Sequence, residues 1–146
     1  IERNGVTLTV IAGSAFGAQA PTVTFSPTLY VAARFAPDGA LALDAEHEER
    51  GVYLVDGDLA IDGEPLAATH MALLAPGETV TLASRTGATV MLLGGAKLDG
   101  ERFIEWNFVA SSREKIARAK AAWAAQTMGH VPGETEWIPL PERPAH

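Results

Sequence analysis

The chain contains no cysteine, and this absence excludes several kinds of site together. Without thiols there is no disulfide framework, no thiolate zinc site and no cysteine nucleophile. Structural disulfides belong to oxidising compartments, so a chain without cysteine fits the cytosol. We therefore expect a cytoplasmic protein.

Positive charge is also scarce. Lys and Arg number 11 against 18 Asp and Glu, which gives a formal net charge of −7 at pH 7 and a pI near 5.0. The sequence has no basic block that would neutralise phosphates. Nucleic acid is therefore not expected as a partner.

Long apolar runs are missing as well. No stretch approaches the roughly 20 apolar residues that cross a bilayer, and Glu2 and Arg3 do not resemble the start of a signal peptide. We therefore expect no membrane partner. Ile1 in place of an initiator methionine indicates a chain that was processed, trimmed or cut from something longer.

What is present favours a folded β protein. The 146 residues are 47% hydrophobic and 20% charged, which suits a single domain with a sizeable core. Between Val6 and Leu98, short apolar runs alternate with turn residues and no helical period intervenes, which is typical of an antiparallel sandwich or barrel. The expected strands are 6–11, 28–35, 40–43, 52–55, 59–61, 71–74, 79–82 and 88–93.

Turn residues separate these strands. Asp56-Gly57 tolerates the positive φ angles of a tight hairpin, and it predicts one between strands 52–55 and 59–61. Asp62-Gly63 and the segment 75–78 predict two further turns. Gly94-Gly95 is expected to end the block of strands.

A different pattern follows residue 99. Residues 103–109 form an aromatic and β-branched run that predicts one strand. Ser111 and Glu114 fit a capping box, in which each side chain satisfies a free backbone donor at a helix start. The sequence therefore predicts a helix that begins at Ser111 and ends near Ala125.

The expected helix is amphipathic. Its apolar stripe consists of Ile116, Ala119 and Trp123, and its cations are expected mostly on the remaining surface. Gly129 is a plausible stop signal. The prolines beyond it rule out further helix and predict an extended tail across the domain; they are Pro132, Pro139, Pro141 and Pro144.

Three pieces of this region, 102–114, 131–134 and 137–142, resemble the C-terminal part of bacterial pirin-like proteins, a branch of the cupin superfamily. Residues 51–59 and 74–78 are similar to the two cupin motifs. The resemblance implies an all-β cupin jelly roll, or double-stranded β-helix, with one C-terminal α-helix and an extended Pro-rich tail. It also implies that residues 1–98 form the β-sandwich or barrel, and that residues 99–146 add the closing strand, helix and tail of the same domain.

A metal-binding cupin supplies two histidines, a glutamate and a third histidine at fixed distances from the motif glycines. The glutamate position falls on Arg50, the histidine pair falls around Asp44 to Glu46, and the last histidine position falls on Val80. None of these side chains is an imidazole, and a guanidinium cannot ligate a cation. The resemblance therefore implies that this chain has no metal-binding residue and no cofactor.

The chain has four histidines, each of which could in principle be a metal ligand. His47, among consecutive carboxylates, could hold a divalent cation if His70 came close in space. We favour a solvated acidic loop with His47 on its surface, because neighbouring side chains cannot all point at one place. His70 is expected to be a capping or surface residue. His130, at the helix stop, and His146, at a terminus expected to be disordered, suggest no ligand.

Other catalytic patterns are absent. No serine lies in a Gly-x-Ser-x-Gly elbow, so no catalytic residue is assigned. Glu105 is expected to face solvent. The three tryptophans are expected in a core or interface, with a ligand pocket as the alternative; they are Trp106, Trp123 and Trp137.

The resemblance also implies a function. Pirins consist of two cupin domains, and the metal centre belongs to the N-terminal one. This chain is therefore expected to be the non-catalytic C-terminal half, which supports a metal-bearing sister domain. Two alternatives stay open: the parent protein is a metal-dependent, quercetinase-type dioxygenase whose site lies in the missing domain, or the chain binds a small molecule in its barrel. In isolation, we expect a homodimer through the face that the sister domain would cover.

Overall fold

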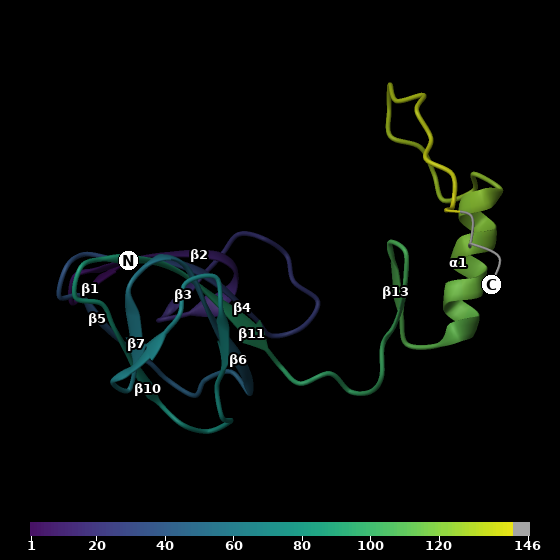
Figure 1. Ribbon diagram of the computed structural model, residues 1–146. Coiled ribbons are helices and arrows are strands. Elements are labelled where there is room, and N and C mark those ends of the chain that lie inside the picture. Colours follow the sequence, from purple (N-terminus) through teal and green to yellow (C-terminus); the bar gives the residue numbers. More distant parts are fainter. Residues whose placement is uncertain (142–146) are drawn as a thin grey trace. The chain divides into compact units, whose positions relative to one another are not determined.

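The computed structural model describes residues 1–141, so the expectations for Pro144, His146 and Glu142 lie outside the described residues. The chain divides into two compact units, residues 1–97 and residues 98–146, which are described separately below (Figure 1). That both belong to one domain stays a prediction. All strand pairings in the described residues are antiparallel, as the sequence predicts.

The first unit is built around a large sheet. Its strands, in spatial order, are β1 (Glu2–Arg3), β2 (Val6–Ala15), β4 (Thr28–Phe35), β11 (Ala88–Gly95), β6 (Glu49–Gly57) and β9 (Met71–Leu73), and β3 (Ala18–Gln19) pairs with β2. Figure 1 shows β11 between β4 and β6, although it is the last strand of the unit along the chain.

A smaller sheet completes the first unit. Its order is β5 (Ala40–Leu43), β10 (Val80–Ala83), β7 (Leu59–Ile61) and β8 (Glu64–Leu66). Alternate residues of both sheets enter one apolar core, because successive side chains of a strand point to opposite faces. The fully buried members include Leu29, Leu54, Leu82 and Leu92. The two-sheeted architecture agrees with the expected cupin jelly roll.

The hairpin predicted at Asp56-Gly57 is wrong. β6 belongs to the large sheet and β7 to the small one, so the chain changes sheets here instead of folding back. Gly57 has φ +91°, and a Cβ on it would lie 2.2 Å from the carbonyl oxygen of Gly87. Asp62-Gly63, by contrast, connects β7 and β8 as a two-residue hairpin, with both φ angles positive.

Three glycines lie inside strands, beyond the strand ends that the sequence predicts. β2 continues past Ile11 to Ala15, and its register with β4 shifts between Val10 and Ala12. Gly13 fits there because its φ is +78° and a Cβ would lie 1.7 Å from the carbonyl oxygen of Thr28. Gly94 and Gly95 likewise belong to β11 instead of ending it.

The second unit begins with a hairpin. The single strand expected over 103–109 is instead two strands, β12 (Phe103–Glu105) and β13 (Phe108–Ala110), which pair antiparallel. Trp106, with φ +52°, turns the chain between them. The aromatic run thus contains a turn that its composition does not reveal.

The single helix in the described residues, α1 (Arg113–Ala124), ends near Ala125 as the sequence predicts, but its capping residues differ from the expected ones. Its N-cap is Ser112 and not Ser111, and the Ser112 hydroxyl accepts a hydrogen bond from the amide of Lys115 at 3.3 Å. At the other end Gln126 takes the left-handed conformation at φ +54°, where the sequence pointed to Gly129. The amides of Gln126 and Thr127 then bond the free carbonyls of the last turn, which is a Schellman arrangement.

Candidate functional site

The positions where a cupin would place its metal ligands come together in the first unit. Val80 of β10 pairs directly with Leu43 at the end of β5, one residue before Asp44. Arg50 of β6 reaches the same place, since its Nη1 donates to the carbonyl oxygen of Asp44 at 2.6 Å. The spacing of these residues in the sequence therefore corresponds to one location in space.

Arg50 is the charged group at this location. The residue is 3% exposed. Besides the bond to Asp44, its Nη2 donates to the carbonyl oxygen of Ala75 at 2.7 Å, and its Nη1 lies 3.5 Å from that of Leu43. The Nε atom is buried and has no hydrogen-bond partner among the described residues.

This donor set does not fit a metal ion. The guanidinium carries a permanent positive charge and no lone pair to donate, and the side chain of Val80 is apolar and belongs to the core. Asp44 and Glu46 carry carboxylates but are exposed. Within residues 1–141, no group of three or more His, Asp or Glu side chains is placed to hold a metal.

His47 is buried, which overturns its expected place on the surface. It is 7% exposed, and its Nε2 lies 2.8 Å from the carbonyl oxygen of Ser14. A carbonyl only accepts hydrogen bonds, so Nε2 carries the proton and is unavailable to a metal in this position. His70 is exposed, as expected, with Nδ1 3.0 Å from the carbonyl oxygen of Ala68.

A second polar cluster surrounds Asp58, which sequence reasoning missed. Its carboxylate accepts hydrogen bonds from the amides of Arg85 and Thr86, from the Thr86 hydroxyl, and from the Ser84 hydroxyl. The Thr86 hydroxyl, followed by the Arg85 and Thr86 amides, lowers the pKa of Asp58 to about 2 from 3.8. The only feature of the sequence that could have pointed to this cluster is the position of Asp58 directly after the motif glycine Gly57.

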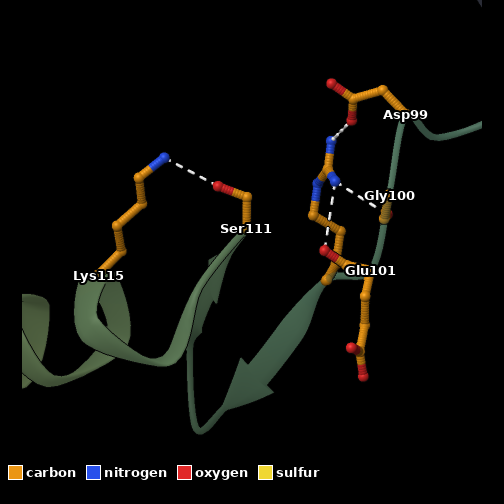
Figure 2. Close-up of polar contacts among 6 residues, drawn as sticks. Asp99, Gly100, Glu101, Ser111 and Lys115 are labelled. Atoms are coloured by element: carbon orange, nitrogen blue, oxygen red, sulfur yellow. Dashed lines mark hydrogen bonds and ion pairs between the residues drawn. The ribbon is translucent and has the colours of Figure 1, made fainter.

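In the second unit, charged side chains pair along the hairpin and helix. Arg102 donates to Asp99 Oδ1 and to the carbonyl oxygens of Gly100 and Glu101, and Lys115 Nζ donates to the Ser111 hydroxyl at 2.8 Å (Figure 2). The Arg102 guanidinium lowers the pKa of Asp99. These contacts tie short stretches of the chain together.

The sequence predicts that Glu105 faces solvent, and the structure corrects this expectation. It is half-buried and forms an ion pair with Lys120 of α1. The pair lies in a hollow of about 500 Å³ between the hairpin and the helix. The guanidinium of Arg113 covers the ring of Phe103 there, 4.5 Å from its centroid. Three cationic side chains, Arg102, Arg113 and Lys120, and one carboxylate, Glu105, line this hollow.

The tryptophans contact one another. The ring of Trp123 lies 5.5 Å from that of Trp106 and 6.5 Å from that of Trp137, measured between centroids. Trp123 Nε1 also donates to the carbonyl oxygen of Ile138 at 2.9 Å, which holds the tail beside the helix. Trp123 and Trp137 also border a hollow of about 400 Å³.

The large sheet carries an apolar outer face. Strand register places two rows of side chains across its β4, β11, β6 and β9 strands, on the side opposite the core. We call this surface the outer face; it consists of Tyr30, Ala32, Tyr53, Met71, Leu73, Met91 and Leu93. Leu73 is 82% exposed and Met71 51% exposed. A solvated antiparallel sheet would have polar residues here, so the outer face is unusual for a surface.

A hollow of about 470 Å³ opens at one corner of the outer face, beside the edge strand β9. Met71, Leu73 and Leu93 contribute apolar walls, and Glu48 and Glu49 lie at its border. Both glutamates are exposed. The surface thus combines an apolar depression with a negatively charged edge.

Comparison with known proteins identifies the family. Residues 30–129 match the family model of the pirin C-terminal cupin domain. The chain belongs to the pirin family. A pirin-like protein of Caulobacter vibrioides is 46% identical to this pirin chain over 143 residues, which are 97% of the chain and 49% of that protein. A Pseudomonas aeruginosa protein provisionally named a quercetin 2,3-dioxygenase is 41% identical, covering 84% of the chain and 39% of that protein.

A solved structure shows the same fold. The quercetin 2,3-dioxygenase of Acinetobacter baumannii superposes with a TM-score of 0.83 at 24% identity, and the match covers 100% of this pirin chain and 50% of that protein. The chain therefore spans about half the length of its relatives or less. In its described part, no helix has both the length and the hydropathy that a membrane span requires.

Proposed function

We propose that this chain is the non-catalytic C-terminal cupin half of a pirin-like protein, and that it packs against and supports a metal-bearing N-terminal cupin domain. The outer face of the large sheet carries this proposal. Seven apolar or aromatic residues on a solvated surface would lower solubility and favour association. A second domain that covers them accounts for their presence.

The chemistry of the partner follows from the surface. The core of the outer face is apolar, so the partner presents an apolar patch whose side chains enter the hollow beside β9. Glu48 and Glu49 at the border favour lysine or arginine at the partner's rim. The relatives, about twice as long as this chain, provide the length for such a domain.

A chimera tests the sister-domain role. In it, this chain replaces the matching half of the Caulobacter vibrioides protein, to which it is 46% identical. We expect one cooperative unfolding transition, and a lower midpoint when Leu73→Lys places a charge in the covered interface. Val23→Lys is the matched control, because Val23 is 79% exposed but lies in a loop outside the outer face. Equal midpoints for the two variants would contradict the proposal.

The relatives' names support a second proposal, that the parent protein is a metal-dependent quercetin dioxygenase whose site lies in the N-terminal domain. Arg50 and Val80 give this half no donor set for the metal. Its contribution would be to border the site. We expect the metal-loaded chimera to consume quercetin and this chain alone not to consume it. A chimera that folds and binds metal but is inactive would exclude this activity.

A further inference from the structure

We infer that the guanidinium of Arg50 acts as a built-in cation that holds together the segments on which a cupin places its metal ligands. A metal ion in a protein joins distant segments through several electron-pair donors. Arg50 also joins distant segments, but it does so by donating hydrogen bonds to their carbonyl oxygen atoms. The inference rests on its contacts, its burial and its charge, and does not depend on the proposed role beside a sister domain.

The contacts of Arg50 connect three parts of the fold. Its backbone belongs to β6 of the large sheet. Its Nη1 donates to Asp44, directly after β5 of the small sheet, and its Nη2 donates to Ala75, in the connection from β9 to β10. The carbonyl oxygen of Arg50 in turn accepts from the amide of Leu74 at 2.9 Å. One side chain therefore fastens both sheets and the connection between them.

The charge of Arg50 is balanced by dipoles instead of a counter-ion. The ion pairs formed by the described residues do not include Arg50, although acidic side chains surround it in the sequence. Three carbonyl oxygens within 3.5 Å direct their negative ends at the guanidinium. Bonds to a charged donor are stronger than neutral ones, and burial strengthens them further.

A fixed charge at this place has a second effect. A metal cation that approached the carbonyl oxygen of Asp44 would be repelled by the guanidinium, whose Nη1 lies 2.6 Å from that oxygen. The arginine thus both replaces the cross-link of the metal and repels the ion itself. Arginine suits the role better than lysine because its planar fork reaches two acceptors in different directions.

The test compares Arg50→Met with Arg34→Met in the whole chain. Arg34 lies on β4 of the same sheet but is exposed, so both variants lose one positive charge from a strand. We expect Arg50→Met to raise the equilibrium constant for unfolding roughly 100-fold, because it removes the hydrogen bonds that a buried guanidinium donates to Asp44 and Ala75, and Arg34→Met to change it by less than about 3-fold. Arg50→Lys should fall between them. Equal effects of the two methionine variants would overturn the inference.

A measurement on the unmodified chain applies even if Arg50→Met does not fold. The Nε–H proton of Arg50 should exchange with solvent at least about 100-fold more slowly than those of exposed arginines, because it is buried and the head group is fixed. Exchange as fast as at Arg34 would overturn the inference. Titration with Mn²⁺, Ni²⁺ and Fe²⁺ should leave the Tm unchanged, and stoichiometric binding that raises it while Arg50 is present would also overturn the inference.

Discussion

Asp58 fastens the turn between β10 and β11 to the point where the chain changes sheets. Its carboxylate collects two amides and two hydroxyls from Ser84, Arg85 and Thr86, and the Ser84 hydroxyl accepts from the amide of Gly87 at 2.9 Å. All these donors favour the ionised carboxylate, which explains its lowered pKa. The strength of this connection therefore depends on pH.

The pH dependence of stability tests this role. The pKa of Asp58 is about 2 when folded and 3.8 ordinarily, so its stabilising effect is complete above pH 4 and is lost as pH falls from about 4 toward 2. Asp58→Asn should be less stable at pH 7 and show a shallower loss of stability over that window. Urea titrations at several pH values measure both slopes, and parallel curves for the two proteins would exclude the role.

For single residues, burial was the property that the sequence predicted least well. His47 and Arg50 lie in a strongly acidic stretch, which predicts a solvated loop, yet both are buried. Each is stabilised by backbone carbonyls that are distant in the chain, Ser14 for His47 and Ala75 for Arg50. The spacing to the motif glycines pointed to Arg50 and Val80, and the structure places Arg50 against Asp44 and Val80 against the neighbouring Leu43. Their acceptors could not be predicted, because backbone carbonyls carry no mark in the sequence.

At the scale of elements, the start of α1 provides a clear comparison between neighbouring residues. The Ser112 hydroxyl caps the helix by accepting from the Lys115 amide, whereas the Ser111 hydroxyl accepts from the exposed ammonium group of Lys115. Ser112→Ala should therefore destabilise the second unit by about 1 kcal/mol. Ser111→Ala should be close to neutral, since it removes an exposed contact. Amide exchange of Lys115 distinguishes the two variants, and an equal loss of protection would contradict the assigned cap.

Two identical turn signals show what local sequence can predict. Asp56-Gly57 and Asp62-Gly63 both favour hairpins, but only the second forms one. The strand after Asp56-Gly57 pairs with β10, and this pairing depends on residues more than twenty positions away. Strands whose ends coincide with strong turn residues, such as β4, β5 and β7, were predicted to the residue. Local signals thus fixed where the chain bends, and long-range pairing decided which strands became neighbours.

For the whole molecule, the outer face predicts association. The isolated chain exposes Leu73 and Met71 beside half-buried aromatic and methionine side chains. We expect a homodimer at micromolar concentration, in which the outer faces of two copies cover each other around a two-fold axis. Leu73→Lys should shift the chain to a monomer, and Val23→Lys should leave the dimer intact. Light scattering coupled to size exclusion measures both, and a monomeric wild-type chain would rule out this association.

The place of β11 in the large sheet limits the order in which this chain can fold. β11 is the last strand of the first unit, yet it lies between β4 and β6 and completes the ladders of both. During synthesis, residues 28–57 leave the ribosome long before residue 95. Until β11 follows, the edges of β4 and β6 that pair with it have no partner. The unit therefore cannot mature from its N-terminus onward. Folding waits for the end of the unit, and a chain interrupted before residue 88 would present two open apolar strand edges to chaperones or to other copies.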